Sequence, residues 1–150
     1  MLLDKRKTAA LLYIDGASSN NGSSAAAAGY GIYGSATRGV SRALPAGTTN
    51  SRAELYALIG ALAIISRSKW KRAWVLGCDS EYVIRGVTKD VWAWRLNGWR
   101  RTGNKKVKNV DLWERIVGGV RGLQRHMWMW KVARNCNPAD KLAKMATRAR

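Results

Sequence analysis

The feature that most constrains the fold is one long helical pattern set between strand-like segments. In TTNSRAELYALIGALAII, which starts at Thr48, apolar residues recur at 55, 58, 59, 62 and 65, close to a 3.6-residue period. Asn50 or Ser51 is a candidate N-cap, and Glu54 falls in the first turn. The pattern predicts an amphipathic helix whose apolar face packs on another layer of structure.

The segments on either side of this helix predict that the other layer is a mixed sheet. Before it, 8–15, 29–35 and 39–44 are typical of three strands in an antiparallel arrangement. After it come a short strand over 73–77, a helix capped by Ser80, a helix over 110–123, a strand over 126–132 and a helix opened by Pro138. We therefore expect an α/β fold, with 1–150 forming one domain.

The length and composition suit such a domain and point to an anionic partner. The chain has 150 residues, of which 47% are apolar, enough to bury a core. It carries 27 Lys and Arg against nine Asp and Glu, a net charge of +18. So large a surplus destabilises a compact chain unless a polyanion binds to it, which makes nucleic acid the leading partner. An acidic membrane surface is a weaker candidate, since no basic amphipathic helix stands out.

The remaining composition excludes some sites and locations. Two distant cysteines, Cys78 and Cys136, and a single His without a CxxC pair argue against zinc and predict ordinary reduced thiols. No apolar run approaches the roughly 20 residues that a membrane span needs. We expect a monomer in the cytoplasm or another reducing intracellular compartment, with no membrane partner.

Four of the nine acids occupy two repeated kinds of place. Asp15 and Asp79 follow apolar strands, whereas Glu54 and Asp140 lie in the first turns of helices. In an open sheet, strand ends and helix starts meet at one edge, where ligands bind. If the strands that end at Asp15 and Asp79 are neighbours, all four carboxylates converge there.

Converging carboxylates favour divalent cations. Two like charges ~4 Å apart repel by about 4 kcal/mol at an effective dielectric near 20, and a cation removes that repulsion. Hard oxygen ligands suit Mg²⁺ or Mn²⁺, and two such ions can activate water in phosphodiester cleavage. Each acid alone also has an ordinary explanation, in helix dipoles or turns, but all four fit a single edge.

The ordered motifs YIDGA, TNSRAELYAL, CDSEYVIRGV, GWR with NKKVKNVDLW, and ADKLAKMA resemble those of type 1 ribonuclease H and the related domains of reverse transcriptases. The resemblance covers about 9–146. It implies a five-stranded mixed sheet with flanking helices, and hydrolysis of the RNA strand of RNA–DNA hybrids with two Mg²⁺ ions, for which Mn²⁺ is a possible substitute. The metal-binding and catalytic acids of the family fall on Asp15, Glu54, Asp79 and Asp140.

The same resemblance implies a nucleic-acid-binding surface. Gly16, Asn21, Asn50, Ser51 and Arg52 would lie near the backbone of the hybrid. The segment 90–108 looks like the basic protrusion of the family, with Trp94, Trp99, Arg100, Lys105 and Lys106 as candidate contacts to the DNA strand. The alternative is that the Trp side chains belong to the core and the cations to a solvated face.

The chain departs from the family pattern near its last acid. Many members carry a His in a glycine-rich loop there, whereas VARNCNPAD offers Arg134, to which we assign a possible loop role. His126 lies at the start of the last strand and is not expected to be catalytic. We predict activity without a His, slower or with a stronger Mn²⁺ preference. NPAD is also one residue shorter than the corresponding spacing of relatives, so the position of Asp140 needs testing.

Three functions compete for this pattern. The first is a hybrid-directed ribonuclease, favoured by retention of all four acids. The second is a catalytically weak nucleic-acid-binding module of a larger assembly, favoured by a charge of +18. The third is a different nuclease or a strand-transfer enzyme on the same fold, which the run Asn50, Ser51, Arg52 matches less well.

Overall fold

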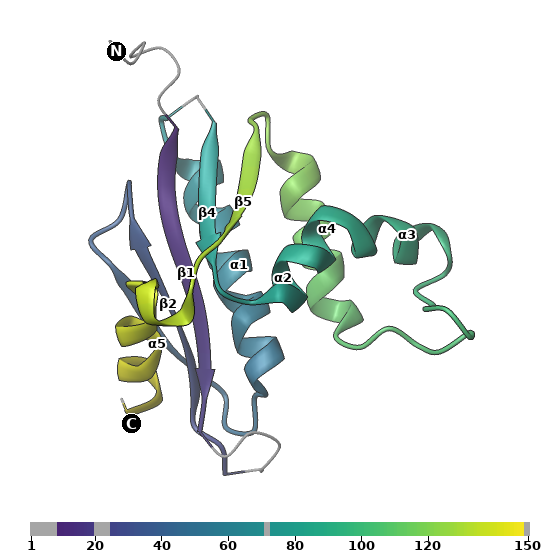
Figure 1. Ribbon diagram of the computed structural model, residues 1–150, viewed down its shortest axis with the longest axis horizontal. Coiled ribbons are helices and arrows are strands. Elements are labelled where there is room, and N and C mark those ends of the chain that lie inside the picture. Colours follow the sequence, from purple (N-terminus) through teal and green to yellow (C-terminus); the bar gives the residue numbers. More distant parts are fainter. Residues whose placement is uncertain (1–8, 20–24, 71–72, 149–150) are drawn as a thin grey trace.

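The computed structural model describes residues 9–19, 25–70 and 73–148, which form a five-stranded sheet flanked by helices (Figure 1). The strands lie in the order β3-β2-β1-β4-β5. They span Ala10–Ser18 (β1), Ala28–Gly34 (β2), Val40–Leu44 (β3), Trp74–Cys78 (β4) and Met127–Lys131 (β5). The first three strands pair antiparallel, whereas β4 joins β1 and β5 joins β4 in parallel. The predicted mixed sheet, with β1 and β4 as neighbours, is confirmed.

Helices cover both faces of the sheet. They span Asn50–Arg67 (α1), Glu81–Arg85 (α2), Val91–Leu96 (α3), Val110–Gly122 (α4) and Ala139–Arg148 (α5), with a π-helical turn over Gly86–Asp90 and a 3₁₀ turn over Arg134–Cys136. Helix α1 packs on β1, β2 and α4, and α5 packs on β1, β2 and β3. No helix within the described ranges has the length and apolar character needed to cross a membrane.

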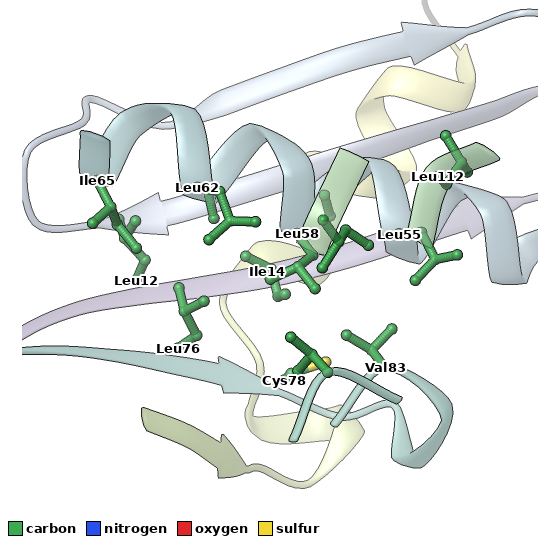
Figure 2. Close-up of a cluster of buried hydrophobic side chains, with 14 of the residues drawn as sticks. Leu12, Ile14, Leu55, Leu58, Leu62, Ile65, Leu76, Cys78, Val83 and Leu112 are labelled. Carbon is green, nitrogen blue, oxygen red and sulfur yellow. The ribbon is translucent and has the colours of Figure 1, made fainter. Parts of the chain in front are cut away.

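The main core lies between the sheet and α1. Ile14 of β1 lies beside Leu58 of α1, and Leu12 of β1 and Leu76 of β4 belong to the same cluster, further along the helix (Figure 2). All four side chains are fully buried or nearly so. The apolar stripe that the sequence predicts on α1 is therefore the face that packs on the sheet.

Strand β1 is longer than predicted. The strand was expected to end at Asp15, but it continues to Ser18 because β2 extends the pairing, up to Ser18 with Ala28. The parallel pairing with β4 stops earlier, at Tyr13 with Gly77. Asp15 therefore lies beyond the last β1–β4 pair, although it is inside the strand.

Two other boundaries also differ from the sequence analysis. The N-cap of α1 is Thr49, whose Oγ1 accepts the N–H of Arg52 at 3.2 Å, so Asn50 and Ser51 are the first residues of the helix. Glu54 consequently lies beyond the first turn, outside the range in which the helix dipole stabilises an acid. The helix capped by Ser80 runs on past Val87 through the π-helical turn into α3.

Candidate active site

Four elements bring the four predicted acids to one edge of the sheet. Asp15 comes from β1, Asp79 directly follows β4, Glu54 comes from α1 and Asp140 from the first turn of α5. Gly16 allows α1 to approach β1, since a Cβ at this position would lie 2.3 Å from the backbone nitrogen of Glu54. The close approach of strand and helix brings Glu54 and Asp15 into the lining of one pocket.

Asp15 is buried among other carboxyl groups. Burial is the main cause that raises its pKa to about 8, and the charge of Asp79 and a hydrogen bond with Asp140 act in the same direction. The backbone N–H of Gly16 donates to Asp15 Oδ1 at 3.0 Å and opposes the shift. Without a cation, Asp15 therefore holds a proton near neutral pH and donates it toward Asp140.

Glu54 and Asp79 are each held by a polar neighbour. Ser80 Oγ donates to Glu54 Oε2 at 2.7 Å while it accepts the N–H of Val83 as the cap of α2. Burial raises the pKa of Glu54, and the hydrogen bond from Ser80 only partly offsets the shift. Asn137 Nδ2 donates to Asp79 Oδ2 at 3.3 Å and to the carbonyl oxygen of Ile14 at 2.9 Å.

Asp140 is partly exposed, and its carboxylate is paired with a cation of its own helix. Lys144 Nζ lies 2.8 Å from Asp140 Oδ2, one turn further along α5. Burial alone would raise the pKa of Asp140, but the hydrogen bonds from Lys144 and Asp15 outweigh it and lower the pKa. The shorter NPAD loop therefore still brings Asp140 to the edge of the sheet, against Asp15.

Three of these acids, together with Arg134 of the 3₁₀ turn, line a pocket of about 160 Å³. The lining is Asp15, Gly16, Ala17, Ser18, Asn50, Glu54, Arg134, Asp140 and Lys144. The donors are hard carboxylate oxygens, the ligands that Mg²⁺ and Mn²⁺ prefer. Among the residues that the structure describes, no three His, Cys, Asp or Glu side chains are arranged so that they could hold a metal ion. The type of donor nevertheless suits a divalent cation. Such a cation would have to compete with Ser80 for Glu54 and with Lys144 for Asp140.

The residues at the start of α1 that are predicted to lie near the nucleic-acid backbone have different surroundings. Asn50 lines the carboxylate pocket, whereas Ser51 lines a second pocket of about 420 Å³ with Trp94 and Arg101. The guanidinium of Arg52 makes two hydrogen bonds to Asp111 of α4, at 3.0 and 2.7 Å, which raise the pKa of Arg52. Asn21 lies outside the described residues.

The basic segment 90–108 comprises α3 and the loop that follows it, which extend away from the sheet (Figure 1). Trp94 and Trp99 are half-buried; the ring of Trp94 packs edge-on against Trp113 of α4, with 5.9 Å between the ring centroids. Lys105 and Lys106 are exposed in the loop, and Arg100 Nη1 donates to the carbonyl oxygen of Asn104. The Trp side chains therefore support the protrusion, while the lysines face solvent.

The structure separates Arg134 from His126. Arg134 lines the carboxylate pocket, and its charge lowers the pKa of both Glu54 and Asp140. His126 is exposed and immediately precedes β5, which runs parallel to β4. It therefore lies at the end of the strands opposite Asp79, away from the carboxylates.

Ser80, Asn137 and Lys144 also contact the carboxylates of this site, although none of them is among the residues predicted from the sequence. Lys144 follows Asp140 by four residues on a helix, a spacing that predicts their ion pair. Ser80 was identified only as a cap, although it directly follows Asp79. No sequence signal reveals that Asn137 reaches both Ile14 and Asp79.

The structure defines the class of protein: an α/β protein whose mixed sheet carries acids from four elements at one edge. Comparisons with known proteins specify the family. The family model described as RNase H matches residues 7–148. The chain is 37% identical to a ribonuclease H of Methylococcus capsulatus, over 87% of this chain and 84% of that protein. It is 41% identical to one of Verminephrobacter eiseniae, over 65% of this chain but only 61% of that protein. The chain therefore belongs to the ribonuclease H family.

A solved structure supports the fold independently of close sequence similarity. The foamy viral protease-reverse transcriptase in complex with an RNA/DNA hybrid superimposes with a TM-score of 0.73 at 22% identity. The match covers 98% of this chain and 21% of the viral chain. The same arrangement of strands and helices therefore occurs within a larger polypeptide.

Proposed function

We propose that the chain is an endoribonuclease that hydrolyses the RNA strand of RNA–DNA hybrids. The observation that carries this proposal is the convergence of carboxylates from β1, α1, β4 and α5 at one edge of the sheet. A net charge of +18 supports a polyanionic substrate. The family supports the reaction, and the hybrid bound by the foamy viral protein supports the substrate.

Asp15, Glu54, Asp79 and Asp140 would hold two divalent cations, Mg²⁺ with Mn²⁺ as a substitute. Bound cations would supply activation of the attacking water and stabilisation of the leaving oxygen. The raised pKa values of Asp15 and Glu54 support this role, because a nearby cation favours the ionised forms that burial disfavours. Asn137 and Ser80 orient two of the carboxylates, as outer partners of metal ligands commonly do.

Other residues would position the substrate. Arg134 and Lys144 place positive charge beside the pocket, where a scissile phosphate is attracted. Gly16, Asn21, Asn50 and Ser51 are proposed to lie along the backbone of the hybrid, with Arg52 held beside them by Asp111. Trp94, Trp99, Arg100, Lys105 and Lys106 of the protrusion would contact the DNA strand.

Cleavage of an end-labelled hybrid tests the proposal, with single-stranded RNA and duplex DNA as controls. Wild type and Asp79→Asn are compared in Mg²⁺, Mn²⁺ and EDTA. The variant is a matched one, because the amide oxygen of Asn can still accept the hydrogen bond from Asn137. The proposal predicts metal-dependent cutting of the hybrid's RNA alone, lost in the variant.

A second candidate is a catalytically weak nucleic-acid-binding module of a larger assembly. It is favoured by the Lys144–Asp140 ion pair, which keeps one carboxylate occupied, and by the large positive charge. Tight, salt-sensitive binding of hybrid with no cutting in either metal would select this candidate. Cutting by Lys144→Ala but not by wild type would identify the ion pair as the obstacle.

A further inference from the structure

Helix α5 covers only part of the sheet face that carries Asp15. Gly31 of β2 lies directly beneath the helix, since a Cβ there would lie 2.5 Å from the carbonyl oxygen of Ala139. Two residues further along β2, Tyr33 points to the same face but is 50% exposed. Within the described ranges, Figure 1 shows no helix in front of the adjoining parts of β4 and β5.

Aromatic side chains line the uncovered part. The strand register pairs Tyr33 with Tyr13, Tyr13 with Gly77, and Gly77 with Trp130, so these residues share one face. The ring of Tyr13 lies over Gly77, and its centroid is 6.2 Å from that of Trp130. A second row runs beside the first. We call the two rows the aromatic sheet face: Leu11, Tyr13, Tyr33, Val75, Trp128 and Trp130.

This face is exposed and carries no charge of its own. Trp128 is 62% exposed and Trp130 48%. Of the acids in the described ranges, only Asp15 points to this side from the sheet strands, and it lies beneath α5 at the border of the face. The exposed cations Arg38 and Lys69 lie in loops at the end of the sheet away from Asp15. Clustered exposed apolar side chains of this kind mark an interaction site.

We propose that the aromatic sheet face binds single-stranded nucleic acid by stacking bases on Trp128, Trp130 and Tyr33. Small RNA-binding domains use exposed aromatics on a four-stranded sheet in this way. Trp128 and Trp130 are two residues apart on one strand, about 6.6 Å, so each ring can take a separate base. A net charge of +18 attracts an anionic strand and repels a second copy of the chain.

The face is distinct from the carboxylate pocket but adjoins it. Tyr13 precedes Asp15 by two residues on the same side of β1, so a strand that leaves the pocket across the sheet passes over the aromatic rings. The binding is sequence-tolerant, because stacking reads no hydrogen-bonding pattern. It requires no metal and no cleavage.

The test is fluorescence anisotropy of a labelled single strand of about 12 nucleotides, within the usual site sizes, measured in EDTA. Wild type is compared with Trp128→Ala/Trp130→Ala and with Met145→Ala, which removes a 57% exposed side chain from α5 as a matched control. The double variant, which loses two stacked bases, is expected to bind at least roughly 30-fold more weakly, and the control like wild type. An abasic strand of equal length should bind wild type and the double variant alike.

Equal affinity of wild type and the double variant for the normal strand would overturn the proposal, as would equal affinity of wild type for normal and abasic strands. Self-association of wild type that the double variant loses, measured by light scattering, would assign the face to a second copy instead. Circular dichroism monitors folding, and Trp128→Ala alone replaces the double variant if the latter does not fold. Because EDTA prevents cutting, a negative result here leaves the hydrolase proposal untouched.

Discussion

Glu54 and Leu58 lie one turn apart on α1, and both side chains point toward the sheet, yet they act on stability in opposite ways. Leu58 is fully buried among Leu12, Ile14 and Leu76, where removal from water favours folding. Glu54 is also largely buried, but burial raises its pKa, which means that its charged form is disfavoured there. One helix thus supplies the core with stability and the pocket with a carboxyl group whose charged form is costly there.

Burial alone therefore does not distinguish a structural residue from a functional one. A carboxylate kept in a pocket against its own desolvation needs a partner, and around this pocket the partners are hydroxyl, amide and ammonium groups. Such partners hold the carboxylates without neutralising all of them. Substitutions in the two regions should therefore separate activity from stability.

Glu54→Gln should break activity while leaving the fold intact. Gln keeps an oxygen to accept the hydrogen bond from Ser80 but removes the charge. Cleavage of hybrid should fall by on the order of 10²–10³-fold, as for the loss of one preorganised electrostatic group. Thermal unfolding in EDTA should show a midpoint equal to or above that of wild type. Near-normal cleavage by this variant would remove Glu54 from the proposed site.

Leu58→Ala is the converse substitution. The lost contacts and the cavity should lower the free energy of unfolding by about 2–5 kcal/mol. The rate per folded molecule should stay near that of wild type, because the pocket lies at the end of the sheet beyond this residue. Urea denaturation and cleavage rates at a temperature where the variant is folded measure the two effects separately.

Arg52, near the start of α1, allows a structural role to be distinguished from a binding role. The Asp111 side chain of its ion pair is largely exposed. Arg52→Ala and Asp111→Ala should therefore each lower the free energy of unfolding by only about 0–1 kcal/mol. If Arg52 also contacts the backbone of the hybrid, Arg52→Ala alone should weaken hybrid binding. Equal effects of both variants on binding would mean that the pair acts only by joining α1 to α4.

Thr49→Ala should have only a modest effect. It removes the side-chain cap of α1 and should lower stability by roughly 1 kcal/mol, with little change in the cleavage rate. Thr49→Ser, which keeps a hydroxyl, is the matched control. A large loss of activity in Thr49→Ala at unchanged stability would contradict this expectation. It would show that the cap positions the pocket residues of α1 and does not merely stabilise the helix.

The sequence predicted the elements and the four acids because each depends on local pattern. Apolar periodicity located α1, and short apolar runs located β1 and β4, whose parallel pairing brings Asp15 near Asp79. The cap was misplaced by one residue because Thr49, Asn50 and Ser51 are all good caps. The end of β1 was misplaced because turn-forming residues such as Gly16 and Ser18 are held in the strand by β2.

What could not be predicted depends on contacts between distant segments. The alternation in HMWMWKV predicted β5, but the exposure of Trp128 and Trp130 follows from where α5 stops on the sheet. The double role of Asn137 depends on the path of the loop after β5 past Ile14. Likewise, Arg52 pairs with Asp111 because α4 packs beside α1.

A cation site built from these carboxylates is tested most directly by thermal unfolding of wild type and Asp15→Asn in EDTA and in Mg²⁺ or Mn²⁺, from pH 4 to 8. The pKa of Asp15 is raised from 3.8 to about 8, so its contribution to stability is full below its ordinary pKa and is lost as the pH rises toward 8. Asn keeps the hydrogen bond from Gly16, can still donate to Asp140, and does not titrate.

In EDTA the variant should become more stable than wild type as the pH rises, and metal should raise the midpoint of wild type but not of Asp15→Asn. A wild-type midpoint that is indifferent to metal, or a variant that is less stable than wild type at pH 8 in EDTA, would contradict a cation site built from these carboxylates.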